Sequence, residues 1–384
     1  MPSRLSQFDC ILRRLLPCGV KSVLNDTCKS VNLPTPCREV LSADKTEADL
    51  PLELTVLIAQ CLTSDADKRS LRLLSEQWKA AVDSSVTRLS GNQYKTLDRD
   101  LERLVAFKRL RSLSLSQCGG IRSLKGLAHL PGLRTLELNF CTGLKPGALR
   151  VLAQLPELRK LDLSGCSAVT DECMSDIAGL PKLEWLSLQG CTALSAAGLY
   201  HLQRCRRLRH LDLSGTNIVS LGFLEMADPP RELNRDVKSE PEPTRRVVSI
   251  QAVCTSRGAA AARWSATKAQ RSSLRRLLLA DCACLAGSAL CGLSGHAELE
   301  TLDLSRSIQA LSDASIAALQ QINGLRRLKL EGSVELHDET LLKLAALGRL
   351  THLDVSECPS LAPPAITALR RRMPSTCAIF SATS

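Results

Sequence analysis

Residues 158–166 read LRKLDLSGC, and the pattern L-x-x-L-x-L-x-x-C that they form decides the fold of this chain. Eight further stretches match it; five of them also end in Cys, and three end in Thr or Ser. The steps between successive copies are 23, 25, 25, 25, 66, 25, 26 and 25 residues, because the copies begin at Leu110, Leu133, Leu158, Leu183, Leu208, Leu274, Leu299, Leu325 and Leu350. A unit that recurs with one main period indicates a solenoid.

Each copy predicts one strand followed by one helix. The x-L-x-L-x core alternates, so its leucines face one side of a strand and the x positions face the other. No single unit can bury its leucines, whereas stacked units can, with parallel strands ~4.8 Å apart. Residues 86–90 look like a degenerate earlier copy. Apolar residues then recur at helical spacing, for example Met174, Ile177, Ala178 and Leu180, and candidate N-caps precede these stretches at Thr170, Ser195 and Ser312.

Cysteine recurs at the last position of the motif. A small, weakly polar side chain suits this turn, where backbone groups need partners. Because these cysteines lie one per repeat and do not converge on a point, we expect reduced, buried thiols rather than disulfides or a zinc site. The position is held by Cys118, Cys141, Cys166, Cys191, Cys282 and Cys358, and by Thr216, Ser307 and Ser333 in the other copies.

The stretches CGGI, CSAVTDE and CTALS resemble the cysteine-containing class of leucine-rich repeats, and the resemblance extends over residues 86–380. It implies an α/β leucine-rich-repeat solenoid, a horseshoe with parallel strands inside and helices outside. We place the repeats at residues 89–225 and 274–384, because the one long step separates two arrays.

Residues 226–273 are rich in Pro, Ser, Arg, Glu and Ala, so we predict a disordered insertion there. Residues 247–253 (VVSIQAV) are the alternative, as a short strand or a ruined repeat. Residues 237–240 (VKSE) look like a sumoylation consensus, and Ser239 precedes acidic residues as some kinase sites do. A plain solvated linker explains the same residues.

The composition excludes several classes of function. The chain has 384 residues and a net charge of +11, and only 3% of its residues are aromatic, which argues against a stacking platform for nucleic acid. Asp281 interrupts the apolar stretch 277–295, leaving pieces shorter than the ~20 residues that span a membrane. Charges also interrupt residues 8–16, so they form a poor secretory signal. We expect a cytoplasmic protein, with the nucleus as the other compartment, that contacts neither nucleic acid nor membrane.

Residues 1–46 carry no repeat and are expected to be poorly ordered, with a cleaved organelle leader as the alternative. Residues 47–88 predict a small helical module, with two apolar faces at three- and four-residue spacing. A module of this size is too small to be very stable alone, so it should complete its core against a partner or against the first repeat.

This module resembles an F-box. The pattern of that family is matched in order by Leu50, Pro51, Glu53, Leu54, Ile58, Leu62, Asp65, Leu71, Leu74 and Trp78. The chain departs from the pattern directly before Trp78, where the family usually has Val-Cys-Lys/Arg and this sequence has Leu74-Ser75-Glu76-Gln77. The alternative is that residues 50–88 only cap the first repeat.

The resemblance implies a role as the substrate receptor of an SCF-type cullin–RING ubiquitin ligase. The module would bind the Skp-type adaptor, which links the chain to the cullin ligase subunits, and the repeats would bind the protein substrate. The residues implied in adaptor binding are Leu50, Pro51, Leu54, Ile58, Leu62 and Trp78. A stand-alone repeat scaffold without a ligase link is the competing hypothesis.

The x positions of the strands predict the binding surface. Trp185 should be exposed there, and an exposed Trp on a rigid strand is a good anchor for a partner. Alternatively, Asp is simply the usual residue of LDLS, and neighbours such as Lys160 offset its charge. The residues we expect to contact the substrate are Glu137, Lys160, Asp162, Trp185, His210 and Asp212.

Motifs of catalysis are missing from the sequence. It has no Gly-rich phosphate loop, no H-E-x-x-H, no C-x-x-C pair and no nucleophile elbow, and its six histidines are scattered. We therefore expect a protein that is not an enzyme and needs no metal or cofactor.

Overall fold

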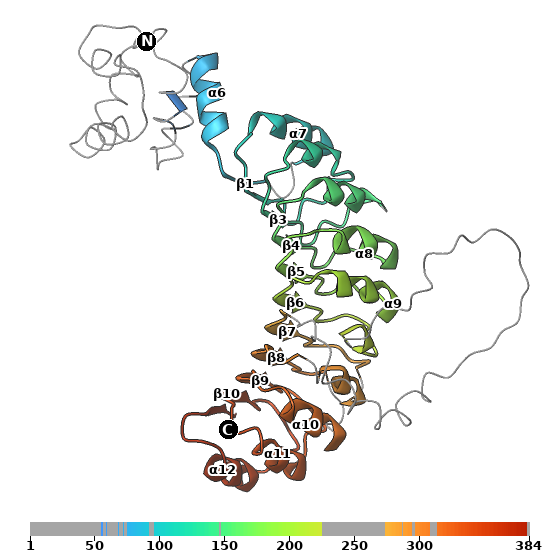
Figure 1. Ribbon diagram of the computed structural model, residues 1–384, viewed down its shortest axis with the longest axis vertical. Coiled ribbons are helices and arrows are strands. Elements are labelled where there is room, and N and C mark those ends of the chain that lie inside the picture. Colours follow the sequence, from blue (N-terminus) through green and yellow to red (C-terminus); the bar gives the residue numbers. More distant parts are fainter. Residues whose placement is uncertain are drawn as a thin grey trace, which may run out of the picture. The chain divides into compact units, whose positions relative to one another are not determined.

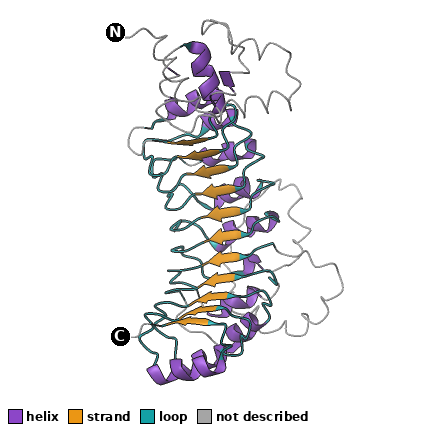
Figure 2. Cartoon of the chain, turned by 90° about the vertical axis from the view of Figure 1, so that its left-hand side faces the viewer, coloured by secondary structure: helices purple, strands orange, loops and turns teal. Residues whose placement is uncertain are grey.

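Parallel strands of three residues recur once per repeat along the chain, with helices on the other side of each repeat (Figures 1 and 2). The computed structural model describes residues 55–56, 59, 68, 72, 75–91, 96–145, 147–224, 273–285, 287–293, 296–307 and 313–381. The chain divides into two units, Met1–Ala193 and Leu194–Ser384. Both contain leucine-rich repeats, as the resemblance implied.

The strands of the first unit pair in chain order, from β1 to β5. Its elements are α6 (Glu76–Ser85), β1 (Arg88–Ser90), α7 (Asp98–Glu102), η2 (Arg103–Ala106), β2 (Ser112–Ser114), η3 (Lys125–His129), β3 (Thr135–Glu137), η4 (Ala148–Gln154), β4 (Lys160–Asp162), α8 (Asp171–Ala178) and β5 (Trp185–Ser187), where η denotes a 3-10 helix. The degenerate copy at 86–90 is confirmed, because it supplies β1.

The strands of the second unit pair in the same way, from β6 to β11. Its elements are α9 (Ala196–Leu199), η5 (Tyr200–Arg204), β6 (His210–Asp212), η6 (Gly222–Leu224), β7 (Arg276–Leu278), η9 (Gly287–Leu293), β8 (Thr301–Asp303), α10 (Asp313–Gln320), β9 (Arg327–Lys329), α11 (Asp338–Leu344), β10 (His352–Asp354), α12 (Pro363–Arg372) and β11 (Ala378–Phe380). The last strand, β11, extends the array beyond the nine copies of the motif.

The register follows the repeat. In the first unit Leu136 pairs with Leu161 and Leu161 with Leu186, so the leucines at the centres of the strands form one buried row. All three are 0% exposed. Burial of one leucine side chain contributes about 1.5–3 kcal/mol to the free energy of unfolding. Each repeat buries its leucine only against the neighbouring repeats, so the repeats stabilise one another.

The long step between copies leaves the register intact. His210 on β6 pairs with Arg276 on β7, although 66 residues separate Leu208 from Leu274. The repeats therefore stack as neighbours across the insertion. Apart from Ser273, the insertion at residues 226–273, including residues 237–240 and 247–253, lies outside the described residues.

The residue before the motif's last position has a left-handed backbone in every copy. Five of these residues are not glycine, although only glycine adopts positive φ without steric cost. This backbone requirement was not predicted from the sequence. The residues and their φ angles are Gln117 (60°), Phe140 (59°), Gly165 (66°), Gly190 (68°), Gly215 (66°), Asp281 (58°), Arg306 (53°), Gly332 (66°) and Glu357 (55°).

The predicted N-caps differ in what their side chains do. Ser195 is confirmed, because its hydroxyl accepts a hydrogen bond of 3.1 Å from the N–H of Ala197. Thr170 precedes α8 as predicted, but its side chain makes no capping bond to the backbone. Asp171 and Glu172 in the first turn supply the negative charge that favours a helix start. Ser312 lies outside the described residues.

Candidate functional site

The exposed face of the first unit's strands carries four of the predicted substrate-binding residues. The register places Lys160 beside Trp185, and Glu137 beside Asp162. Side chains two residues apart on one strand share a face, so all four point away from the buried leucines. The structure therefore brings Glu137, Lys160, Asp162 and Trp185 together on one surface.

Trp185 is half-buried rather than fully exposed, which corrects the expectation from the sequence. The Nζ atom of Lys160 lies 4.7 Å from the centre of the Trp185 ring, within range of a cation–π interaction. The same Nζ atom donates a hydrogen bond of 2.8 Å to Oε1 of Glu137. The three side chains form a connected row across β3, β4 and β5, which fixes the indole at one place on the face.

The charges in this row stabilise each other. The hydrogen bond from Lys160 holds the pKa of Glu137 below its ordinary value of 4.5, against the opposing effect of partial burial. Glu137 is therefore ionised at neutral pH. Because Lys160 already neutralises this carboxylate, the row presents an aromatic surface with little net charge.

Asp162 stabilises the turn that follows β4. Its Oδ1 atom accepts hydrogen bonds from the backbone N–H of Ser164 at 3.0 Å and from the Ser164 hydroxyl at 2.6 Å. The Ser164 hydroxyl in turn lies 2.7 Å from that of Ser187 on the next repeat. The carboxylate thus holds the turn after β4, which supports the alternative that Asp in LDLS is an ordinary choice of the repeat.

The same arrangement recurs in the second unit. Oδ1 of Asp212 accepts from the N–H of Ser214 at 3.0 Å, and Asp303 and Asp354 hold Ser305 and Ser356 in the same way. His210 is half-buried on β6. His210 and Asp212 therefore share a strand of the second unit.

Phe140 is a feature of this face that the sequence analysis missed. It lies in the turn after β3, has a left-handed backbone and is 53% exposed. A Cβ atom on Gly165 would come within 2.5 Å of the Phe140 ring, so the ring lies directly over that glycine. A non-glycine residue at positive φ is uncommon and marks a place where function is worth testing. Its signal in the sequence was a Phe followed, one repeat later, by a Gly at the same position.

The cysteine column holds consecutive repeats together. The Sγ atom of Cys141 donates to the carbonyl oxygen of Leu115 at 3.0 Å, and that of Cys166 donates to Leu138 at 3.0 Å. Cys282 and Cys358 make equivalent bonds to the preceding repeat at 3.2 Å. The prediction that these side chains meet backbone groups at the turn is confirmed, and Ser307 also donates to such a carbonyl, that of Leu279.

Burial makes these thiols unreactive. Desolvation raises the pKa of Cys141 and of Cys166 to about 12, and that of Cys191 to about 11. The nucleophilic thiolate is therefore almost absent at neutral pH. The chemistry of this column is structural.

The module before the repeats is described only in part. Trp78 on α6 is 1% exposed, and α6 packs on η2 of the first repeats. The hydroxyl of Ser75 accepts from the N–H of Trp78 at 3.3 Å and caps the helix. Trp78 therefore belongs to the core at this end of the array. The other residues implied in adaptor binding, Leu50, Pro51, Leu54, Ile58 and Leu62, lie outside the described residues.

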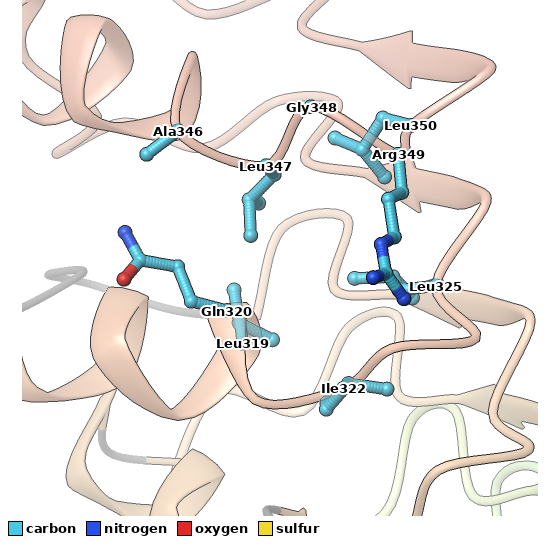
Figure 3. Close-up of a pocket in the computed structure, with 9 residues that line it drawn as sticks. All are labelled: Leu319, Gln320, Ile322, Leu325, Ala346, Leu347, Gly348, Arg349 and Leu350. Carbon is cyan, nitrogen blue, oxygen red and sulfur yellow. The ribbon is translucent and has the colours of Figure 1, made fainter.

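A cavity of about 280 Å³ lies in the second unit between the helix ends and the turns before β9 and β10 (Figure 3). Four of its nine lining residues are leucine, and Gln320 and Arg349 are its polar side chains. The Nη1 atom of Arg349 donates to the carbonyl oxygen of Asn323 at 3.1 Å. This cavity offers no nucleophile, acid or base.

Within the described residues, no three His, Cys, Asp or Glu side chains are grouped so that they could hold a metal ion. Likewise, no helix of the described part of the chain has both the length and the apolar character that crossing a membrane requires.

Comparisons with known proteins bear on the fold alone. No protein-family model matches the chain, and no curated protein matches it. Among solved structures it is similar to the TLR13–ssRNA13 complex (TM-score 0.45, 18% identity, 78% of this chain and 37% of that one). It is also similar to the internalin inlF of Listeria monocytogenes (0.42, 16%, 88% and 99%) and to the Rad7–Elc1 complex in yeast (0.39, 15%, 97% and 97%).

Proposed function

We propose that this chain is a non-enzymatic protein-binding receptor whose first-unit strand face holds the substrate, within an SCF-type ubiquitin ligase. The observation that carries the binding role is the row of Glu137, Lys160 and Trp185, with Phe140 exposed in the adjacent turn. Interface hot spots favour aromatic side chains on rigid supports, and both rings here are held by contacts between repeats.

The spacing of the two aromatic residues suits an extended segment of a partner. Trp185 lies on β5 and Phe140 lies in the turn after β3, so the two residues belong to repeats two strands apart, about 10 Å across the sheet. An extended chain crosses that distance in about three residues. The neutralised pair between the rings avoids a large cost of desolvating a lone charge.

The ligase role rests on the F-box-like pattern of residues 47–88 directly ahead of the repeats. In that role the chain performs no covalent chemistry. It raises the local concentration of substrate lysines near a conjugating enzyme held by the same assembly, and this proximity accelerates transfer.

A stand-alone scaffold is the second candidate. Burial of Trp78 and packing of α6 on η2 favour it, because a cap of the repeat array requires both features and needs no adaptor.

The test uses the full-length chain and a purified Skp-type adaptor. We expect the chain to bind the adaptor, Leu50→Ala with Pro51→Ala to abolish binding, and the control Val105→Ala, a substitution on the exposed surface of η2, to have no effect. Trp185→Ala should leave adaptor binding unchanged and should weaken the binding of any substrate identified in the assembly. If the wild-type chain does not bind the adaptor, the ligase role is wrong and the scaffold role replaces it.

A further inference from the structure

A cluster of arginines lies in the second unit, where the chain enters β6 and β7. Arg204 ends η5, Arg207 lies in the turn that follows, and Arg209 directly precedes β6. The carbonyl oxygen of Arg209 accepts from the N–H groups of Arg275 and Arg276 at 2.8 and 2.9 Å. The two entry segments therefore lie side by side, and their arginine side chains are exposed.

In the copies that begin at Leu158 and Leu183 these positions are neutralised, whereas Arg109 and Arg111 of the copy at Leu110 make no ion pair with a described residue. Lys182 occupies the turn position equivalent to Arg207, and its Nζ atom lies 2.5 Å from Oε1 of Glu157. Arg159 occupies the position equivalent to Arg209, and it pairs with Glu184 at 3.1 Å. The repeat can therefore balance basic residues here with acidic residues on the neighbouring repeat.

The second unit lacks this balance. Arg275 is the member of the cluster with acidic partners, Glu300 at 3.5 Å and Glu298 at 3.9 Å. Arg204, Arg207, Arg209 and Arg276 make no ion pair with any residue that the structure describes. Like charges on adjacent strands destabilise a sheet, so this cluster lowers stability unless an anion binds it.

Neighbouring acidic residues limit where such an anion can lie. On the same strands, two residues beyond Arg276, the fifth position of the motif places Asp212 and Asp303 on either side of Leu278. Asp303 is paired with Nζ of Lys329 at 3.4 Å, so the negative charge of Asp212 is the one that directs an anion toward the strand entries. The attractive surface is thus a narrow edge across two repeats.

We propose that this edge binds an acidic segment of a protein partner, at a site separate from the face of the first unit. A peptide with several Glu or Asp residues fits an edge bounded by acids, and arginine forms strong paired hydrogen bonds with carboxylates. A nucleic acid fits less well, because its phosphates would pass over Asp212 and because β6, β7 and β8 carry no Phe, Tyr or Trp for stacking.

The experiment measures binding of a fluorescent Glu-rich peptide to the full-length chain by anisotropy. Arg207→Glu with Arg209→Glu should weaken binding at least about tenfold, because two attractive charges become repulsive. The matched control is Arg159→Glu with Lys182→Glu, which changes the net charge equally at equivalent positions of the first unit and should change the affinity by less than about twofold. Circular dichroism establishes that both variants fold.

A second measurement, the thermal midpoint of unfolding, tests whether the charges of the cluster are unbalanced. It uses variants that neutralise one charge and reverse none. Removing an unbalanced like charge should raise the thermal midpoint of unfolding, so Arg209→Gln should be at least as stable as wild type. Arg159→Gln loses the ion pair with Glu184 and should therefore be less stable than wild type. The proposal is overturned if the peptide does not bind, if both double variants weaken it equally, if Arg209→Gln lowers the midpoint more than Arg159→Gln, or if an oligonucleotide of equal charge binds more tightly.

Discussion

Replacing Gly165 with Ala should destabilise the first unit more than the same change at Gly190. Both glycines hold the same position of the motif and have nearly equal φ angles, 66° and 68°. The conformational cost of a left-handed Ala, about 1–2 kcal/mol, is therefore common to both. The two sites differ in their surroundings, because a Cβ atom on Gly165 would lie 2.5 and 2.7 Å from atoms of the Phe140 ring, whereas one on Gly190 would meet nothing closer than 3.9 Å.

The size of the difference follows from these distances. Carbon atoms in contact normally lie about 3.5–4.0 Å apart, so the Phe140 ring must move by about 1 Å. A displaced rotamer costs about 0.5–1.5 kcal/mol. We therefore expect Gly165→Ala to lower the free energy of unfolding by about 1 kcal/mol more than Gly190→Ala does.

The assay is urea unfolding of the full-length chain, compared at constant m-value. A double-mutant cycle with Phe140→Ala supplies the control, since the extra cost at Gly165 should disappear when the ring is absent. Equal midpoint shifts for the two glycine variants, or an extra cost that persists without the ring, would contradict the packing of Phe140 on Gly165.

Two further predictions concern thiols and pH. Iodoacetamide should label the exposed Cys284 in the native protein much faster than Cys166, whose pKa burial raises to about 12; comparable labelling by peptide mass spectrometry would exclude the buried column. Because folding lowers the pKa of Glu137, its ionised form stabilises the folded protein at pH values above 4.5, the ordinary pKa of the group. This stabilisation is lost as the pH falls through the lowered pKa of the folded state. Lys160→Met should therefore destabilise the protein more at pH 6 than at pH 3, by less than about 1 kcal/mol for this half-exposed pair, and equal losses at both pH values would refute the coupling.

The repeat sequence was sufficient to predict the strands, their order and the buried leucine row. Those features depend on periodicity, and each copy repeats the same local choice at Leu136, Leu161 and Leu186. The contacts of the cysteine column were also predictable, since a small polar side chain recurs where a backbone carbonyl needs a donor. The strand β11 lies within the predicted repeat range, but no copy of the motif marks it, because Thr376, Ile379 and Ser381 stand where the motif has leucines.

The surface was less predictable because it depends on pairs of residues from different repeats. Trp185 was expected to be exposed, but Lys160, 25 positions earlier, covers part of its ring. Phe140 was missed for the same reason, since its position makes sense only beside the glycine of the following copy. A single copy of the motif specifies neither contact, because each requires the distance between neighbouring strands and the rotamers on both.

The two proposed surfaces should differ in how they attract a partner. On the first-unit face, Glu137 neutralises Lys160, and Asp162 accepts hydrogen bonds from its own turn. Short-range contacts with Trp185 and Phe140 should therefore dominate there. Such contacts depend little on salt. In the arginine cluster of the second unit the charges are unbalanced, and their attraction extends over a Debye length, about 10 Å at 0.1 M salt. The cluster is therefore suited to accelerating the encounter with an acidic partner, and the aromatic face is suited to holding a partner segment through short-range contacts.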